Sequence, residues 1–476
     1  MGTRSYKFGM QVKLWTGALI LLTAAALVTA GCSGYNQAGM STTSTQTGPA
    51  FVVGTDAPMA SVVSFAVPVN SVTAKDASGT SVSLISGTPT VDFARFNGLQ
   101  TLLDMNDVPV GTYTSLSITL GSATIGYLNM PASGAPTIAT EAATYPSSAS
   151  TYTYTVTLAS PLVVTQAGTP VGLRVDFDLH KSIQVDSGGA ITGQVTPVFN
   201  VKTVGPSDPD AYIDEFVAAV VSVNVTGQSF VVQGPHGEQF TINVNGQTEW
   251  DNNESLSDLT TSSIVEISGT LDRADQTLDA DEVAILSQNG FYAGGQVTYV
   301  SPASGPATSF DLYVRGTLPT GTGVELGQIA QVDLSGNEKF FIYWMHNPLT
   351  EFLFNSSTLL PGQHVSVGGP ASGAVNAQAL TVNRVVLRDW GFNGTVVAGS
   401  VNSTNGTFQI QINGFAGLLV PQTVTVYTAA RTDFRDGLTG LSDVSGGANV
   451  RVVGLLLKDP TSGNTVLLAH DVDAFN

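Results

Sequence analysis

Apolar and polar side chains alternate along much of the chain after residue 31. Three clear examples are the runs 115–120, 240–244 and 408–412, in which every second residue is apolar. Bounded by Gly, Asn, Asp and Pro, this period of two is typical of antiparallel strands with one face in solvent. No stretch after residue 31 carries a comparable apolar stripe at helical spacing. The sequence therefore predicts an all-β fold, in which 93–105 is the best candidate for a short helix or loop excursion.

The strand-like runs group into one larger unit and three smaller ones. A stretch rich in Gly, Pro and Asp at 205–210 separates the larger unit from the rest, and turn formers of this kind indicate a hinge. We expect a β-sandwich, Ig-like or transthyretin-like, at 51–205. Three copies of a smaller unit are expected to follow at 214–287, 289–388 and 389–476.

Short motifs recur in these three copies. The first and third share a T-x-[FW] motif, at 248–250 and 432–434, and both have a Leu-Ser-Asp triplet. Four positions of the first and second copies match at a displacement of 100 residues, namely Leu259 and Leu359, Val265 and Val365, Ile267 and Val367, and Gly269 and Gly369. In the third copy, Gly454 takes the place of Gly269. About five strands in each copy suit a small OB-like β-barrel, whose closure leaves no sheet edge to pair with the next copy.

A P-x-G-x-Y turn at 109–113 precedes one of the strands of the larger unit. Pro109 fixes φ for a turn, and Gly111 permits a positive φ. Tyr113 is expected to pack its ring inward while its hydroxyl reaches a backbone partner. We therefore assign this turn a structural role.

Four landmarks of the larger unit occur in the order of a known family. They are T-D-A-P at 55–58, P-x-G-x-Y at 109–113, D-F-D-L at 176–179 and V-T-P-V-F at 195–199. Together they resemble a bacterial lipoprotein domain of unknown function, numbered 4382, which implies an exported β-sandwich and no known activity. The three copies resemble a second domain of unknown function, numbered 5666, through the order G-x-V, T-x-F, T-x-[FW] and L-x-x-G-x-x-V-x-V-x-G.

The composition argues against nucleic-acid binding and excludes sites that need several cysteines. The 476 residues include 17 Lys and Arg against 36 Asp and Glu, so the formal net charge is −19. Nucleic-acid binding requires clustered cations that neutralise phosphates, so we expect no nucleic-acid partner. The single cysteine excludes a disulfide framework and a CxxC zinc site.

The N-terminus has the features of an export signal. Residues 1–31 carry three basic and no acidic residues, and an uncharged apolar run from Leu14 to Ala30 precedes Cys32. The end of this run resembles a bacterial lipobox, although Thr29 stands where the motif usually has Leu. The resemblance implies cleavage after Gly31 and attachment of fatty acyl chains such as palmitate to Cys32. The alternative is an ordinary signal peptide or a short membrane anchor with an incidental cysteine.

We favour the lipoprotein interpretation because Cys32 is the only cysteine and stands where lipidation needs it. A flexible tether at 32–50, rich in Ser, Thr, Gly and Gln, follows it. Removal of residues 1–31 takes the formal net charge to −22, because three basic and no acidic residues are lost. We expect the lipid on Cys32 alone to contact the membrane and to hold the protein in the cell envelope. By resemblance to other lipoproteins, Ser33 implies the outer membrane, on its periplasmic or surface face.

We find no motif for catalysis, cofactor binding or metal binding. The chain lacks a GxSxG elbow, a Walker loop and a GxGxxG sequence after a strand. The spacing of the five histidines does not match that of metal ligands. They are His180, His236, His346, His364 and His470. Acidic runs such as 279–282 could offer oxygen atoms to calcium but lack EF-hand spacing, so we interpret them as solvated turns. We expect no catalytic residue, no cofactor and no metal.

Aromatic residues of the second copy are the remaining candidate for a binding site. Phe340, Tyr343 and Trp344 could form a platform for sugar rings, because OB-like barrels bind oligosaccharides on one face. The alternative is core packing, which the match of Trp250 with Phe434 in the T-x-[FW] motif favours.

These observations favour a non-catalytic, lipid-anchored envelope protein that acts as a surface scaffold or a weak multivalent binding module. Its partners would be surface polysaccharide or an envelope protein. The first alternative is a carbohydrate-binding accessory protein in surface glycan handling. The second is an enzyme with a dispersed active site in the sandwich, beside Asp176, Asp178 or His180.

Overall fold

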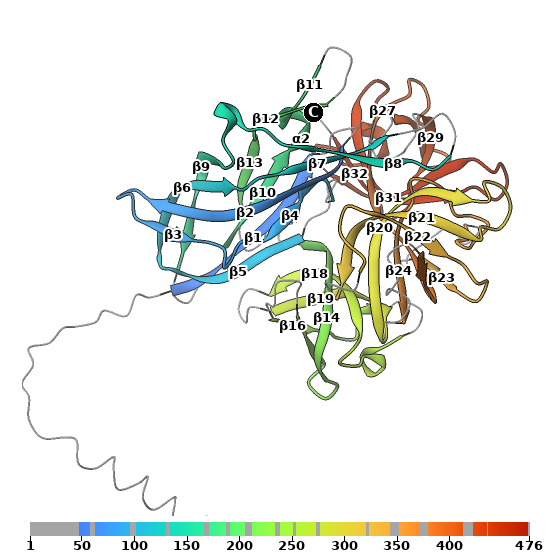
Figure 1. Cartoon of the computed structure of the whole chain (residues 1–476), viewed down its shortest axis with the longest axis horizontal. Helices are drawn as coiled ribbons and strands as arrows, with labels where there is room; N and C mark the ends of the chain where they lie inside the picture. Colours follow the sequence, from blue (N-terminus) through green and yellow to red (C-terminus); the bar gives the residue numbers. More distant parts are fainter. Residues whose placement is uncertain are drawn as a thin grey trace, which may run out of the picture. The chain divides into compact units, whose positions relative to one another are not determined.

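The structure is a computed structural model that describes residues 47–57, 62–95, 101–129, 134–165, 171–186, 191–204, 212–233, 239–250, 254–272, 277–319, 323–342, 352–370, 379–412, 422–435 and 437–474. Strands dominate these residues, which confirms the predicted all-β fold (Figure 1). The expected signal, Cys32 and most of the tether lie outside the described residues. Within the described part of the chain, no helix has the length and apolar character needed to cross a membrane.

Residues 47–204 form a sandwich of two sheets. The first sheet has the order β13-β10-β1-β5, with β1 at Thr47–Ala57, β5 at Thr101–Pro109, β10 at Val171–Asp178 and β13 at Phe199–Val204. Strand β1 lies between β10, to which it is parallel, and β5, to which it is antiparallel. Because Thr47 already pairs with Pro109, this strand begins four residues before the expected start of the sandwich.

The second sheet has the order β8-β7-β2-β6-β9. Its strands are β2 at Val62–Asp76, β6 at Gly111–Leu120, β7 at Thr124–Asn129, β8 at Thr137–Ala142 and β9 at Tyr152–Val164, and β2 also pairs with β3 at Ser81–Ser83 and β4 at Thr90–Asp92. Short elements complete the sandwich, namely 3-10 turns η1 at Phe93–Arg95 and η2 at Pro146–Ser148, helix α2 at Leu179–Ser182, and the pair β11 at Ile183–Val185 and β12 at Ile191–Val195. Of the predicted excursion at 93–105, residues 93–95 form η1 and 101–105 belong to β5, while 96–100 lie outside the described residues.

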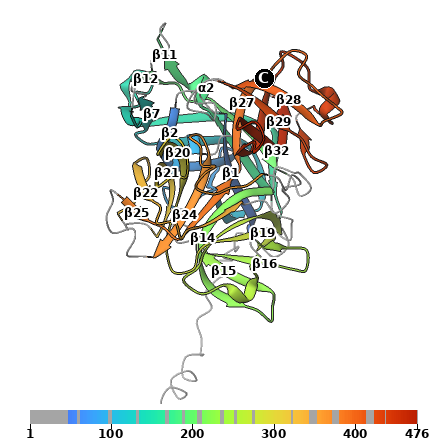
Figure 2. The same cartoon turned by 90° about the vertical axis from the view of Figure 1, so that its right-hand side faces the viewer.

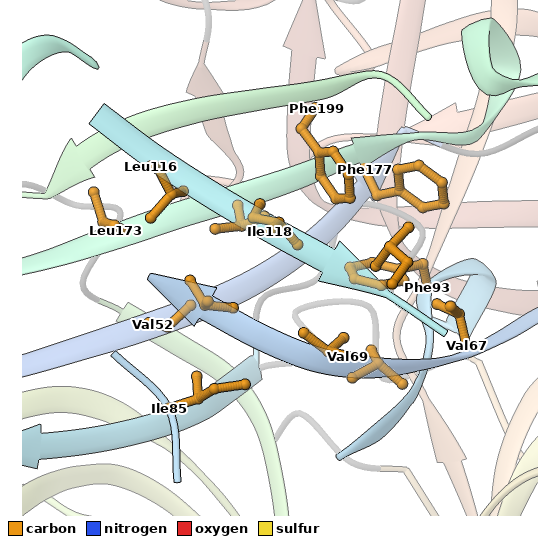
Figure 3. Close-up of a cluster of buried hydrophobic side chains, with 14 of the residues drawn as sticks. Val52, Val67, Val69, Ile85, Phe93, Leu116, Ile118, Leu173, Phe177 and Phe199 are labelled. Carbon is orange, nitrogen blue, oxygen red and sulfur yellow. The ribbon is translucent and has the colours of Figure 1, made fainter. Parts of the chain in front are cut away.

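A cluster of phenylalanines fills the space between the two sheets. Phe177 stacks on Phe199 with ring centroids 4.6 Å apart, and Phe93 approaches the edge of Phe177 at 5.0 Å. Figure 3 shows these rings with Val67 of β2 and Ile118 of β6. The D-F-D-L landmark thus places its phenylalanine in the core of the sandwich.

The P-x-G-x-Y turn forms the contacts predicted for its tyrosine. Tyr113 is buried, and its hydroxyl donates a hydrogen bond of 2.6 Å to the carbonyl oxygen of Pro109. The prediction for Gly111 was wrong, because this glycine does not have a positive φ. A Cβ atom at Gly111 would instead lie 3.4 Å from the Tyr113 ring. The glycine is therefore explained by close packing under the ring.

Residues 212–287, which we call module 1, form a closed ring of five strands. These are β14 at Tyr212–Asn224, β15 at Ser229–Gln233, β16 at Gln239–Asn243, β18 at Ile264–Asp272 and β19 at Thr277–Ser287, with the short β17 at Glu249–Trp250 beside β19 and the 3-10 turn η5 at Leu256–Asp258. The parallel pair of β16 and β19 closes the ring. Figure 2 shows β14, β15, β16 and β19 together.

Residues 390–474, called module 3, repeat these pairings. The strands are β27 at Trp390–Val396, β28 at Thr407–Ile412, β29 at Gln422–Tyr427, β30 at Asp433–Arg435, β31 at Asn449–Lys458 and β32 at Thr465–Ala474, with η7 at Leu441–Asp443. The parallel pair of β29 and β32 corresponds to that of β16 and β19. Likeness to the OB family, and of the sandwich to Ig-like or transthyretin-like folds, stays a prediction.

Residues 290–388, called module 2, have the same order with one interruption. The strands are β20 at Gly290–Ser301, β21 at Ser309–Leu318, β22 at Ile329–Asp333, β23 at Lys339–Ile342, β24 at His364–Pro370, β25 at Ala379–Thr381 and β26 at Arg384–Arg388. The last strand is split, so that β25 pairs with β22 while β26 pairs with β23 and β24. Asn383 lies in the split, directly before β26.

A close approach of two backbones explains the glycine that recurs in each module. A Cβ atom would lie 2.2 Å from the carbonyl oxygen of Asp279 at Gly269, 2.4 Å from that of Thr381 at Gly369, and 2.1 Å from that of Leu468 at Gly454. No side chain fits where the last strand passes this closely. The three glycines therefore occupy equivalent places, as their spacing in the sequence indicates.

Candidate functional site

Modules 1 and 2 meet through a small apolar interface. Val217, Ile264 and Leu286 of module 1 pack against Tyr292 and Val386 of module 2 in one buried cluster. The two backbones are also close, because a Cβ atom at Gly368 would lie 2.2 Å from the carbonyl oxygen of Leu286. This packing leaves no room for a methyl group at that point.

A buried ion pair crosses the same interface. Arg388 on β26 is 3% exposed and Glu266 on β18 is fully buried, and their side chains form a salt bridge. Arg388 also donates from Nη1 to the Ser366 hydroxyl at 3.1 Å. A paired buried charge tolerates little displacement of its partner. The ion pair therefore fixes how the two modules meet.

A second ion pair lies at the edge of this interface. Nη2 of Arg384 donates to Oε1 of Glu254 at 2.6 Å, and the two side chains are only 12% and 18% exposed. The guanidinium carbon of Arg384 lies 4.7 Å from the ring centroid of Phe341. A cation held between a carboxylate and an aromatic face has a well-defined position.

Beside this pair lies a cavity of about 480 Å³. Its volume falls in the range of about 300–1,000 Å³ that small-molecule sites occupy. Most of its lining residues are polar and both modules contribute to it; the lining consists of Glu254, Leu286, Ser287, Gln288, Asn289, Asn337, Lys339, Gly369, Pro370, Asn383 and Arg384. We call this cavity the inter-module pocket and take it as the candidate binding site.

Strand pairing places the two cations of the inter-module pocket together. Strand β23 runs parallel to β26 with Lys339 opposite Arg384, and the Lys339 amide donates to the carbonyl oxygen of Asn383 at 3.0 Å. Side chains of directly paired positions lie on the same face of a sheet. Phe341, two residues after Lys339, shares that face and packs against the interface between the modules.

The charges of the inter-module pocket do not cancel. Arg384 is neutralised by Glu254, whereas Lys339 is exposed and, among the described residues, has no carboxylate within salt-bridge distance. The pocket lining therefore carries a surplus of one positive charge on a chain whose formal net charge is −19.

The predicted aromatic platform is described only in part. Tyr343 and Trp344 lie outside the described residues. Phe340 is half-buried, packs against the core of module 2 and meets the edge of Phe354 at a centroid distance of 5.4 Å. Its pairing with Val385 corresponds to that of Trp250 with Val283, so Phe340 occupies the T-x-[FW] position of module 2. The platform itself stays a prediction.

The acidic residues of the sandwich that could belong to an active site have structural contacts. Asp178 caps α2, since its Oδ1 accepts from the Lys181 amide at 2.9 Å and its Oδ2 lies 2.8 Å from the Lys181 ammonium. Asp176 accepts a long hydrogen bond of 3.4 Å from Asn200. The His180 side chain lies outside the described part of the structure. The enzyme alternative stays a prediction.

Sequence spacing gave no reason to group His364 with His470, yet both contact Asp389. His364 Nδ1 lies 3.0 Å from the carbonyl oxygen of Asp389, and His470 Nδ1 lies 3.0 Å from its Oδ2. Within the described ranges, no group of three or more His, Cys, Asp or Glu side chains is arranged to hold a metal ion. We therefore regard this cluster as a contact between modules 2 and 3.

The acidic run 279–282, which could offer oxygen atoms to calcium, forms an ordinary hydrogen bond within the protein. Oδ1 of Asp279 accepts from the Asn243 side chain at 3.0 Å, which joins β19 to β16. Burial raises the pKa of the Asp281 carboxyl, and the nearby charges of Asp279 and Glu249 raise it further. The described contact of Asp279 is therefore structural.

These observations define an all-β protein in which a two-sheet sandwich precedes three related modules of paired strands. Residues 49–193 match the family described as Domain of unknown function (DUF4382), and residues 219–284 match the one described as Domain of unknown function (DUF5666). The first match covers most of the sandwich and the second most of module 1, in the order that the sequence motifs indicate. No curated protein matches the chain.

Proposed function

We propose that this chain is a non-catalytic, lipid-anchored protein of the bacterial cell envelope that acts as a rigid scaffold. The observation that carries the proposal is the network of buried contacts that joins the sandwich and the three modules. The proposed anchor is a lipid on Cys32, and the proposed location is the outer membrane, on its periplasmic or surface face. Surface polysaccharide or an envelope protein would be its partner.

Arg315 on β21 contacts three parts of the chain. It is 4% exposed, and its Nη1 donates to the carbonyl oxygen of Ala94 in the sandwich at 3.0 Å. Its guanidinium carbon lies 5.2 Å from the ring centroid of Tyr313 in module 2 and 4.8 Å from that of Trp390 in module 3. A buried guanidinium held in this way resists displacement of any of the three partners.

Modules 2 and 3 share a hydrophobic core. Leu455, Leu457, Val466 and Leu468 of module 3 belong to the cluster that fills module 2. The side-chain amide of Gln363 donates to the carbonyl oxygen of Leu456 across the same contact at 2.9 Å. Exposing one such side chain costs about 1.5–3 kcal/mol, so separation of the two modules is strongly unfavourable.

This packing favours a scaffold over a flexible string of binding modules. Linked modules gain from multivalency when their linkers let each one reach its own ligand. Modules that share cores and buried ion pairs move together, and they hold their surfaces at fixed positions. The tether before residue 47 then supplies the reach, and the folded part supplies the rigidity.

We expect modules 1 to 3 to unfold as one cooperative unit. Calorimetry of the full chain in detergent should show a single transition for these modules. In the Gly368→Ala variant, the added methyl group has no space against the Leu286 carbonyl oxygen. It should push modules 1 and 2 apart and produce a separate transition for module 1 at lower temperature.

The matched control is Gly440→Ala. Gly440 has an extended backbone with φ of 171°, and nothing lies within 4 Å of a Cβ atom there. This variant should keep the single transition. Separate melting of each module in the unchanged protein would contradict the rigid-scaffold proposal.

Lipidation is tested at Cys32. In the Cys32→Ser variant, we expect complete loss of palmitate labelling and loss of processed protein from the membrane fraction, because serine offers no thiol for acylation. Ser33→Ala, one residue further on, should remain labelled and membrane-bound. If Cys32→Ser still yields a fully processed, membrane-bound protein, the lipid anchor is wrong.

A carbohydrate-binding accessory role is the second candidate function. The inter-module pocket favours it, because hydroxyl and amide side chains such as Ser287, Asn289 and Asn383 line a cavity of suitable size. Amides offer donors and acceptors together, which matches the hydroxyl groups of a sugar. This role and the scaffold role are compatible, since rigid walls improve a binding site.

A further inference from the structure

We propose that the inter-module pocket binds an acidic saccharide, with the Lys339 ammonium on the sugar carboxylate and the amide side chains on its hydroxyls. This inference rests on the carbohydrate-binding role and adds the ligand class and the residue that selects it. It does not depend on the lipid anchor.

The walls of the inter-module pocket come from two modules and are fixed against each other. Ser287 at the end of β19 and the link residues Gln288 and Asn289 line it together with Asn337 and Asn383 of module 2. The nearby salt bridge between Arg388 and Glu266 and the apolar cluster around Leu286 hold the interface closed. In a preformed site, less of the binding free energy is lost to ordering the side chains of the site.

The charge of the inter-module pocket selects an anion. Glu254 holds Arg384 in a short ion pair of 2.6 Å, so this arginine is not the cation offered to a ligand. Lys339 lines the pocket, is exposed and has no such partner among the described side chains. A salt bridge to a partly desolvated carboxylate is a charge-assisted hydrogen bond, which is stronger than a neutral one.

The rest of the lining favours a sugar over a flat aromatic ligand. None of the lining residues is aromatic, so a planar base would find no stacking partner. The lining includes three asparagines, one glutamine and one serine, which can donate to and accept from several hydroxyl groups. Leu286 and Pro370 supply apolar surface for the C–H face of a sugar ring.

The chain as a whole repels anionic polymers, which restricts where selectivity for an acidic sugar can arise. At a formal net charge of −19, long-range electrostatics oppose the approach of an acidic polysaccharide. Raised salt weakens this repulsion and also weakens the contact with Lys339. Selectivity for an acidic sugar must therefore come from the short-range contact in the inter-module pocket.

Calorimetric titration of the full chain in detergent tests the inference. The probes are tetragalacturonate and tetraguluronate, which are acidic, and maltotetraose, which is neutral. We expect at least one acidic probe to bind more tightly than maltotetraose. Lys339→Gln should weaken that binding about tenfold or more, which corresponds to at least about 1.4 kcal/mol, and leave binding of the neutral probe unchanged.

The matched control is Lys458→Gln. Lys458 is the last residue of β31 in module 3 and lies outside the pocket lining, so this variant removes the same charge elsewhere on the surface. Its affinity for the acidic probe should equal that of the unchanged protein. Equal losses in both variants would show a general charge effect and overturn the site.

The remaining outcomes distinguish a failure of acidic selectivity from a failure of carbohydrate binding as a whole. Binding of maltotetraose as tightly as the acidic probes, unaffected by Lys339→Gln, would overturn the acidic selectivity and leave carbohydrate binding standing. No binding of any of the three probes would overturn both. Asn383→Ala provides a second variant, which should weaken the acidic and the neutral probes alike, because its side chain lines the inter-module pocket whereas its backbone hydrogen bonds remain.

Discussion

Replacement of Arg388 by methionine should lower the free energy of unfolding by about 3–5 kcal/mol. The guanidinium of Arg388 pairs with the fully buried carboxylate of Glu266 at the interface of modules 1 and 2. Methionine fills much of the arginine volume but leaves the carboxylate without its counter-charge. A charge in a low-dielectric interior is costly when it is not paired. Urea denaturation of the full chain, followed by circular dichroism, measures the loss.

The double variant Arg388→Met with Glu266→Leu separates pairing from packing. Removal of both charges should recover most of the lost stability, because no unpaired charge remains. Arg431→Met is the control, since the side chains of Arg431 and Glu249 in its ion pair are 63% and 32% exposed. It should cause a far smaller change. A single Arg388→Met variant as stable as the unchanged protein would mean that the ion pair does not form.

The second large effect is expected from Gly454→Ala. The new methyl carbon would lie 2.1 Å from the carbonyl oxygen of Leu468, far inside van der Waals contact. The strand β31 shifts register at this point, so its backbone cannot move away without breaking the pairs with β32. We expect a loss of about 3 kcal/mol or more, at the upper end for overpacked cores. Urea denaturation again provides the measurement.

Gly440→Ala is the matched control within module 3. Because a Cβ atom there has open space and the backbone is extended, its effect should stay within about 0.5 kcal/mol. Gly269→Ala in module 1 should behave like Gly454→Ala, since its methyl carbon would meet the Asp279 carbonyl oxygen at 2.2 Å. A different result at Gly269 would refute the equivalence of the two glycines.

Local sequence patterns were sufficient to predict the strands and the repeats. Phe408, Ile410 and Ile412 are fully buried, whereas Gln409 between them is exposed, as alternation requires. Such patterns report each residue's own environment within one sheet. The match of Gly269 with Gly369 was visible for the same reason, because a close backbone approach within a module demands glycine wherever that module recurs.

Contacts between modules could not be predicted in this way. Charged residues in strands, such as Glu266 and Arg388, are expected on a wet face, but here the face of one module is covered by the next. Burial by a neighbouring module leaves no periodic signal in either strand. The inter-module pocket was missed for a related reason, because Lys339 and Arg384 come together only through the parallel pairing of β23 with β26.

The position of β1 determines how the folded part would respond to mechanical force. This strand is the first of the described residues, and it lies between β5 and β10 rather than at an edge of its sheet. A pull on Thr47 along the strand acts perpendicular to the hydrogen bonds that join β1 to both neighbours. Both ladders then bear the load in shear, and many hydrogen bonds must break together. The protein should therefore withstand tension between the proposed lipid anchor and a proposed binding partner.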